Sequence, residues 1–268
     1  MGFLYLSFLA IIQGITEFLP VSSSGHLLLI AEMSKNKHHN LQVDIAVHFG
    51  SLLAVILYYR REMSILIRGF YKNIRLDFSH QDSNFFQLIL IATIPVVLLG
   101  FFLKLSGLID SIRSPKVVAF GMIFFGLILY FADRFGAINR KESEWTAKDA
   151  FFMGLCQALA LIPGTSRSGN TITGARMLGF CRQSSINLSM IMSVPTILAS
   201  TVILFWDVIG ANAPVDMSYN LISAACLSFL AAYGSIKLLI LFGRSRNFTP
   251  FVIYRVLLGA IIFIVLYQ

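Results

Sequence analysis

The sequence predicts an all-α, polytopic membrane protein built from two halves with inverted topology. Of the 268 residues, 57% are hydrophobic and 13% are charged, and the mean hydropathy is +0.77. A soluble domain carries about 25% charged residues, so this composition excludes an ordinary soluble protein. Two polar segments interrupt the apolar chain, QGITEFLPVSSSGH from Gln13 and QALALIPGTSRSGN from Gln157. Broken, polar segments at matching points of two halves indicate a site at the interface between repeats.

The two halves correspond residue by residue around these segments. A shift of 144 positions places Gln13 on Gln157, Ser22 on Ser166, Ser24 on Ser168 and Gly25 on Gly169, while Pro20 and Pro163 miss each other by one. A second match, at an offset of 135, aligns SPKVVAFGMI from Ser114 with TPFVIYRVLL from Thr249. We therefore expect one integral membrane domain, residues 1–268, with repeats at 1–135 and 145–268 that meet in the polar loop 134–148.

Each half is expected to begin with a re-entrant helix pair and to continue with three membrane crossings. Phe3–Glu32 is broken by Pro20, three serines and Gly25, and Lys148–Phe180 is broken between Pro163 and Gly169. Such breaks are tolerated in lipid only where protein or water satisfies the backbone. Apolar runs of about 20 residues predict crossings. They lie at Gln42–Tyr59, Phe85–Leu103, Lys116–Phe131, Ser185–Phe205, Leu221–Leu241 and Phe251–Tyr267.

Three crossings per half is an odd number, so the second copy must be inverted, and the basic residues then set the orientation. One face would hold Arg60, Arg61, Arg68, Lys72, Arg75, Arg134, Arg140, Lys141, Lys148, Arg182, Arg244 and Arg246. The other would hold Lys35, Lys37 and Arg113, with Lys104 and Lys116 at its border. By the positive-inside rule the first face, with the expected loop Arg60–Arg75, is cytoplasmic. Both termini are then outside, and the two re-entrant tips meet within the membrane. A net charge of +8 can suggest nucleic-acid binding, but in a membrane chain basic loops on the cytoplasmic face account for it, so we expect no nucleic-acid partner.

Glu17 is the first candidate site residue, because it lies among apolar neighbours in a membrane segment. An ionisable residue there is a functional-site hypothesis by default; the alternative is a carboxyl satisfied by hydroxyls or by arginine. Gln13 lies one helical turn earlier, on the same face. This pair predicts a divalent-cation site with oxygen ligands or an oriented water molecule, and the alternative for Gln13 is a hydrogen bond between helices.

The three serines after Pro20 are typical of a helix start. Ser22, Ser23 and Ser24 would cap the helix, and its free N–H groups would bind an anion, phosphate especially. A plain cap explains one serine and not three in a row. His26 follows directly and is a candidate base, acid or nucleophile, or else a hydrogen-bond partner.

The second segment predicts a matching anion site. Arg167 is its most informative residue, since arginine grips phosphate through a rigid, permanently charged fork; an ion pair with Glu17 is an alternative compatible with that role. Ser166, Ser168 and Thr171 lie at the same helix start. The segment lacks the pattern of a Walker phosphate-binding loop.

These residues predict an intramembrane cavity for a phosphate or diphosphate head group on a lipid tail. Arg255, in the last apolar run, either adds charge to this site or braces its helix, and the sequence leaves both open. Two classes of function fit: a phosphatase acting on the lipid, or a transporter or flippase of the phosphorylated lipid carrier, since inverted repeats with broken helices are transporter architecture. Release of phosphate separates the two.

The motifs resemble the undecaprenyl-diphosphate phosphatase family, the bacitracin-resistance proteins of bacteria. The chain carries an (E/Q)-x-x-x-E motif from Gln13 to Glu17 that continues into FLPVSSSGH, P-G-x-S-R-S-x-x-T from Pro163 to Thr171, and FVIYR from Phe251. The resemblance spans essentially the whole chain. It implies a multi-pass protein of the bacterial inner membrane that hydrolyses undecaprenyl diphosphate to the monophosphate and phosphate, so that the carrier lipid returns to peptidoglycan synthesis. It also implies dependence on a divalent cation, Mg or Ca.

Transferred position by position, the resemblance places Glu17, Ser23, His26, Ser166, Arg167 and Thr171 in the active site. The predicted catalytic residues are Glu17, Ser23, His26 and Arg167. The predicted diphosphate-binding residues are Ser22, Ser24, Ser166, Arg167, Ser168 and Thr171, and the predicted metal ligands are Glu17 and Gln13. Because Gln13 cannot act as a base, the acid–base role shifts to Glu17 and His26. The nucleophile (Ser23, His26 or water) and the presence of homo-oligomers stay open.

Overall fold

The computed structural model describes residues 3–34, 41–108, 114–210 and 219–265, and the described residues form helices without a β-sheet. The first half contains α1 (Phe3–Phe18), α2 (Ser23–Ser34), α3 (Leu41–Tyr58), α4 (Arg60–Ile74), α5 (Gln81–Leu105) and α7 (Pro115–Phe135). The second contains α8 (Ala147–Ala158), α9 (Arg167–Met177), α10 (Arg182–Gly210), α11 (Tyr219–Ser245) and α12 (Thr249–Val265). Single 3-10 turns, η1 (Glu142–Glu144) and η2 (Leu159–Leu161), flank α8.

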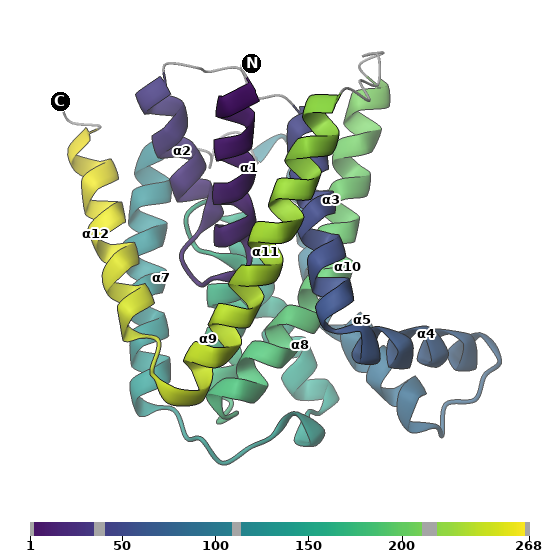
Figure 1. Cartoon of the computed structure of the whole chain (residues 1–268). Helices are drawn as coiled ribbons and strands as arrows, with labels where there is room; N and C mark the ends of the chain where they lie inside the picture. The colour runs from purple at the N-terminus through teal and green to yellow at the C-terminus, as the bar shows by residue number, and fades with distance from the viewer. Residues whose placement is uncertain (1–2, 35–40, 109–113, 211–218, 266–268) are drawn as a thin grey trace.

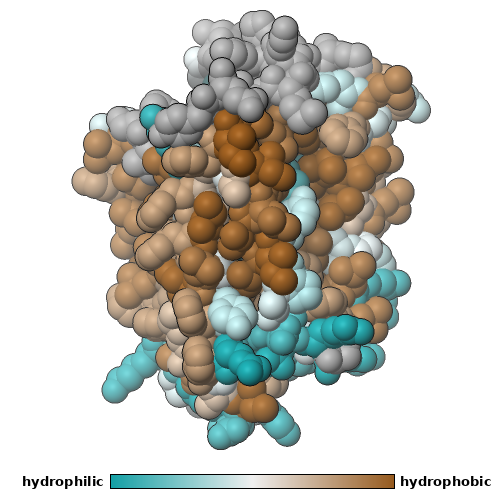
Figure 2. Space-filling view, turned by 90° about the vertical axis from the view of Figure 1, so that its left-hand side faces the viewer, coloured by the Kyte–Doolittle hydropathy of each residue, from teal (hydrophilic) through white to brown (hydrophobic). Residues whose placement is uncertain are grey.

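Five of the described helices, α3, α5, α7, α10 and α11, are long and apolar enough to cross a membrane. All five overlap crossings expected from the sequence. The sixth expected crossing corresponds to α12, a shorter apolar helix of 17 residues. Figure 2 shows a broad apolar surface above a polar lower end. The protein is therefore a multi-pass membrane protein.

The two interrupted segments form helix hairpins that approach each other from opposite ends of the bundle. In Figure 1, α1 and α2 run downward from the upper end and turn near mid-height, while α8 and α9 occupy the lower half. The turn of the first hairpin is residues 19–22, and that of the second is residues 159–166. The second helix start is therefore at Arg167, so that Ser168 and Gly169 belong to the helix and not to the break.

Small residues let the first hairpin and α3 pack closely against α11. A Cβ atom on Gly14 would lie 2.5 Å from the carbonyl oxygen of Ser228, and one on Gly50 would lie 2.2 Å from that of Ala225. Side-chain hydroxyls add hydrogen bonds across these contacts: Ser228 donates to the carbonyl of Val47 and Ser235 to that of Ile15. Close backbone approach and such bonds are the usual basis of helix packing in membranes. They hold the first hairpin at a fixed height.

A buried ionic cluster fixes the lower end of the second hairpin. Asp133, at the end of α7, accepts hydrogen bonds from Arg176 Nε at 3.0 Å, Arg182 Nε at 2.8 Å and the backbone N–H of Phe248 at 3.0 Å. Arg176 also donates to the carbonyls of Ala137, Gly136 and Phe180. The cluster therefore joins α7, α9, α10 and the start of α12.

The basic stretch after α3 is a helix and not a loop. α4 covers Arg60–Ile74 and projects sideways at the lower end of the bundle (Figure 1). Its charged residues are interleaved with apolar ones at helical spacing, and Met63 is buried against the core while Ile67 and Ile74 are exposed. Lys35, Lys37, Arg113 and the predicted end of the last crossing at Tyr267 lie outside the described residues.

Candidate active site

The two hairpins turn in the same way immediately before a helix start. Ser22 and Ser166 have φ angles of 71° and 70°, the left-handed region that residues other than glycine rarely adopt. Ser22 Oγ lies 3.1 Å from Ser24 Oγ, and Ser166 Oγ lies 3.2 Å from Ser168 Oγ. Backbone strain of this kind persists only where the surroundings enforce it, and it clusters at functional sites.

Reciprocal hydrogen bonds join the two tips. The backbone N–H of Gly164 in the second tip donates to Ser24 Oγ in the first at 2.9 Å. Ser168 Oγ in the second tip donates to the carbonyl of Leu19 in the first at 3.0 Å. Ser24 and Ser168, both predicted to bind the diphosphate, thus also lock the two tips together.

Glu17 and Arg167 form an ion pair across the junction. Arg167 Nη2 donates to Glu17 Oε1 at 2.7 Å, and the side chains are 14% and 8% exposed. Gln13 Nε2 donates to Glu17 Oε2 at 2.7 Å, and Arg167 Nη1 donates to the carbonyl of Ser193 at 3.1 Å. Desolvation makes such a pair a weak source of stability, but loss of one partner is costly. The ion pair fixes the Glu17 carboxylate and the Arg167 guanidinium relative to each other.

The predicted metal ligands lie together and leave one oxygen free. Gln13 Oε1 is buried without a hydrogen-bond partner among the described residues. The same residues contain no group of three or more His, Cys, Asp and Glu side chains suited to a metal. One carboxylate and one amide oxygen are too few for a closed protein site, but Mg²⁺ commonly binds through one or two carboxylates together with substrate phosphates. The donor set therefore fits a cation that the diphosphate itself helps to bind.

His26 contacts α12 as well as its own turn. Its Nδ1 lies 2.7 Å from the carbonyl of Ser22, and its Nε2 lies 2.6 Å from the hydroxyl of Tyr254. Because a carbonyl only accepts, Nδ1 carries the proton. The rings of His26 and Tyr254 are stacked at 5.5 Å. Tyr254 was not predicted, because a tyrosine in an apolar run is ordinarily an interfacial or packing residue.

The remaining predicted residues differ in access. Ser23, the first residue of α2, is partly exposed, and its hydroxyl makes no hydrogen bond within the described part of the chain. Thr171 is fully buried and contacts the carbonyls of Arg167 and Ser168 and the hydroxyl of Ser189. Ser23 is thus available to a ligand in this conformation, whereas Thr171 supports the first turn of α9.

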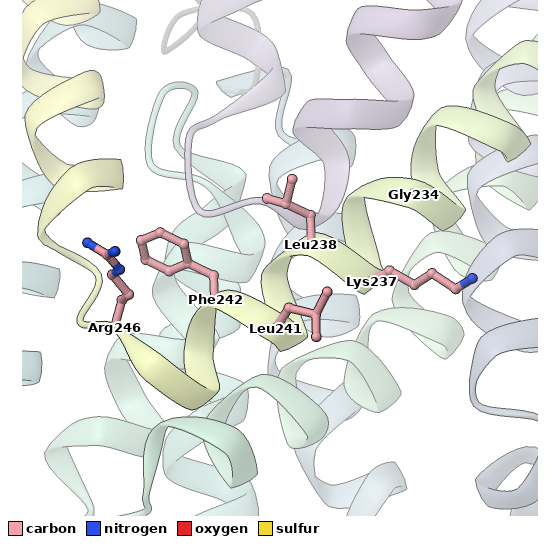
Figure 3. A pocket seen from close by; sticks show the side chains of 6 residues that line it. All are labelled: Gly234, Lys237, Leu238, Leu241, Phe242 and Arg246. Atoms are coloured by element: carbon pink, nitrogen blue, oxygen red, sulfur yellow. The ribbon is translucent and has the colours of Figure 1, made fainter.

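A separate surface groove lies on α11 and contains none of these residues. It has a volume of about 450 Å³ and is lined by Gly234, Lys237, Leu238, Leu241, Phe242 and Arg246 (Figure 3). Its two cationic side chains, Lys237 and Arg246, lie at opposite ends of the groove and point away from each other. The groove therefore offers no convergent set of polar groups like the one at the tips.

The hairpin tips bring together groups whose chemistry suits an anion and a hydroxyl beside it. Two helix starts contribute N–H groups and a positive dipole end, Arg167 contributes a fixed charge, and Ser23 contributes a free hydroxyl. Preorganised charge of this kind is the main requirement for phosphoryl transfer.

Comparison with known proteins places the whole chain among a single group. The family model described as bacitracin resistance protein BacA matches residues 6–261. A protein of Roseobacter denitrificans named undecaprenyl-diphosphatase is 47% identical over 268 residues, with both chains covered completely. Proteins of the same name from a Jannaschia species and from Alteromonas mediterranea are 45% identical over 267 residues and 42% identical over 257 residues, covering 100% and 95% of each chain.

Proposed function

The chain belongs to the bacitracin resistance protein BacA family, and from that premise we propose that it hydrolyses undecaprenyl diphosphate to undecaprenyl phosphate and inorganic phosphate. It is a membrane phosphatase whose reaction returns the carrier lipid to cell-wall synthesis and confers resistance to bacitracin. The observation that carries this assignment is the junction of the two tips, where Glu17 and Arg167 are held 2.7 Å apart beside two helix starts. That junction combines fixed positive charge, free N–H groups and a hydroxyl at one point.

The reaction breaks the bond between the terminal phosphorus and the bridging oxygen. Arg167, Ser166 and the first turn of α9 hold the terminal phosphate, while Ser23 attacks its phosphorus and the lipid monophosphate leaves with the bridging oxygen. Water then attacks the phosphoserine, releases inorganic phosphate and restores the Ser23 hydroxyl. The proton of Ser23 passes to Glu17 or His26. Direct attack by water is the alternative, and a trapped phosphoserine distinguishes the two routes.

A divalent cation, Mg or Ca, is proposed to bind with the substrate. Glu17 and the unpartnered Gln13 Oε1 would hold it together with the phosphate oxygens. When bound, it would neutralise charge on the diphosphate. Glu17→Gln should then raise the concentration of Mg or Ca that gives half-maximal activity and should also lower the rate, because a neutral amide is a poorer ligand for a hard cation. An unshifted half-saturation point would leave Glu17 without a role as a ligand.

We also propose that the two halves are inverted repeats, 1–135 and 145–268, each with a re-entrant pair and three crossings. The paired φ angles of Ser22 and Ser166 and the paired Ser24 and Ser168 contacts support this proposal, since each pair is separated by 144 positions. The basic lower end of the bundle supports an orientation with both termini outside the bacterial inner membrane.

Purified protein in detergent, given a polyprenyl diphosphate, tests the function directly. We expect one inorganic phosphate and one lipid monophosphate per diphosphate consumed. A transporter or flippase of the lipid carrier would instead move the lipid across vesicle membranes without releasing phosphate. That result would overturn the assignment.

A further inference from the structure

Arg255 of α12 contacts the second tip and is completely buried, with 0% of its surface exposed. Its Nη2 donates to the carbonyl oxygens of Thr165 at 2.7 Å, Gly164 at 3.2 Å and Gly121 at 3.4 Å. Its Nε and Nη1 have no hydrogen-bond partner within the described residues. Arg255 therefore carries a full charge and three N–H groups that the described protein leaves unsatisfied.

Arg176 provides an internal comparison. It is also 0% exposed, but its Nε donates to the carboxylate of Asp133 and both terminal nitrogens donate to carbonyls. An isolated buried charge is expensive unless it is paired and hydrogen-bonded. Arg176 meets that condition within the protein, whereas Arg255 makes no ion pair with any described carboxylate. The positive charge of Arg255 therefore lacks a counter-charge among the described residues.

The free end of Arg255 faces the first turn of α9. A Cβ atom on Gly169 would lie 2.8 Å from Arg255 Nη1 and 3.2 Å from Ser166 Oγ. The absence of a side chain at Gly169 therefore leaves room for Nη1 beside the helix start. Arg255 Nη1 thus lies beside the start of α9, where the predicted phosphate-binding residue Ser166 caps the helix.

The hydrogen bonds of Arg255 also orient the tip itself. In a planar trans peptide the C=O and N–H groups point in opposite directions. Because Arg255 holds the carbonyls of Gly164 and Thr165, the N–H groups of Thr165 and Ser166 are directed away from it. The N–H of Thr165 donates to the carbonyl of Ile162 at 3.4 Å, so the N–H of Ser166 is the one that remains for an anion. An oriented N–H group in a turn before a helix start contributes to an anion site of this kind.

The charges at the tips do not balance among the described residues. Glu17 and Arg167 neutralise each other across the tips. Arg255 is then the charge at the tips without a carboxylate among the described residues. A diphosphate brings the negative charge that would compensate it.

We propose that Arg255 is a positioning residue of the diphosphate site: it holds the loop 164–166 in its anion-binding form and supplies the positive charge that the bound diphosphate neutralises. This inference rests on the proposed function, because it assigns the unsatisfied charge to that substrate.

The test compares Arg255→Lys and Arg255→Met by calorimetric titration with inorganic pyrophosphate and by steady-state kinetics. We expect pyrophosphate affinity to fall at least about tenfold in Arg255→Met, equivalent to about 1.4 kcal/mol, and KM for the lipid to rise. Arg255→Lys keeps the charge but loses the planar fork, so it should lie between wild type and Arg255→Met. If Arg255 only packs in the interior, Arg255→Met should bind pyrophosphate better than Arg255→Lys, since methionine suits an apolar interior better than lysine.

A second variant keeps the test decisive if Arg255→Met does not fold. Gly169→Ala retains Arg255 but places a methyl group 2.8 Å from Nη1, and it should also weaken pyrophosphate binding. Gly174→Ala is the matched control on the same helix, where the new methyl group would meet Cys156 Sγ at 2.9 Å. It should bind pyrophosphate as wild type does.

Folded Arg255→Met and Gly169→Ala proteins that bind pyrophosphate as tightly as wild type would overturn the proposal, and so would a wild type that binds none. Pyrophosphate binding without phosphate release from the lipid would contradict the proposed function instead. The two failures are therefore distinguishable.

Discussion

Single residues at the tips have two roles in the proposed site, because side chains that join the hairpins are also the ones proposed to bind the substrate. Arg167 holds Glu17 through one terminal nitrogen and the carbonyl of Ser193 through the other. A diphosphate that approaches Arg167 must therefore share or displace existing bonds. The planar geometry of the Arg167 guanidinium, in addition to its charge, decides whether it can hold Glu17 and the diphosphate together.

Replacement of Arg167 with lysine keeps the charge and removes the fork. We expect kcat/KM to fall at least about tenfold, equivalent to about 1.4 kcal/mol of transition-state stabilisation, while the protein folds normally. Steady-state phosphate release measures the effect. Arg246→Lys, the same change at the exposed groove on α11, is the control and should retain wild-type kinetics. Wild-type turnover in Arg167→Lys would exclude a bidentate phosphate contact.

Tyr254→Phe tests the hydrogen bond that holds His26. The change keeps the stacked ring but removes the hydroxyl that lies 2.6 Å from His26 Nε2. A hydrogen bond of this kind contributes about 0.5–1.5 kcal/mol. If its loss raises the reaction barrier by that amount, kcat falls about threefold to tenfold, and Tm falls by only a few degrees. An increase in kcat would show that Tyr254 blocks His26 instead of orienting it.

At the scale of single residues, the charged residues of the site were easier to predict from the sequence than the residues that they contact. Glu17 and Arg167 could be identified because ionisable residues in apolar segments are rare and need a reason. The contact of His26 with Tyr254 could not, because it joins residues 228 positions apart and tyrosine has no distinctive pattern in an apolar helix. Arg255 was visible as a charge, but the sequence left open whether it braces α12 or serves the site.

At the scale of helices, the lower end of the bundle is held by charge and the tips are held by hydroxyls. The carboxylate of Asp133 joins two arginines and the start of α12. This cluster sets the height of α9 and hence of Arg167. The site therefore depends on an ionic cluster that contains none of the predicted catalytic residues.

Asp133→Asn should destabilise the protein strongly. It leaves Arg176 buried without its counter-charge, a change that costs about 3–5 kcal/mol, and we expect Tm in detergent to fall by about 10 °C. Asp207→Asn is the matched control, because Asp207 pairs with Lys104 at 2.5 Å but the two side chains are 36% and 41% exposed. Its Tm should stay within a degree or two of wild type, and an equal loss in both variants would contradict a special role for the cluster.

The helices themselves were largely predictable, with one instructive exception. Long apolar runs and the Pro and Gly breaks located the crossings and both hairpins to within a few residues. The prediction of a loop at Arg60–Arg75 is wrong: α4 is a helix, and its density of basic residues hides the apolar residues that recur at helical spacing. The signal in the sequence that could have identified this helix is the amphipathic periodicity of its apolar residues.

At the scale of the whole molecule, the order of helices brings two distant segments to one point. α1 begins and α12 ends at the same end of the bundle (Figure 1), while α4, the loop after α7 and the end of α11 carry basic residues at the other. The sequence predicted this arrangement through internal matches at fixed offsets. It could not predict the contacts between the tips, which depend on how the hairpins pack against α7 and α11.

The proposed orientation has a direct test. Reporter fusions at Gln268 should report an outside location, and insertions near Arg68–Arg75 should report the cytoplasm, because basic residues are retained on the cytoplasmic side. A cytoplasmic Gln268 would reverse the orientation.

The central claim is that the two tips act as one site, and a double-mutant cycle between Glu17 and Arg167 tests it most directly. Glu17→Gln, Arg167→Lys and the double variant are compared by kcat/KM for a polyprenyl diphosphate, with folding checked for each. Residues that work as a unit show strongly non-additive losses. We expect the double variant to be little worse than the poorer single variant. Losses that multiply would mean that the carboxylate and the guanidinium, 150 positions apart in the chain, act independently, and would contradict a single site.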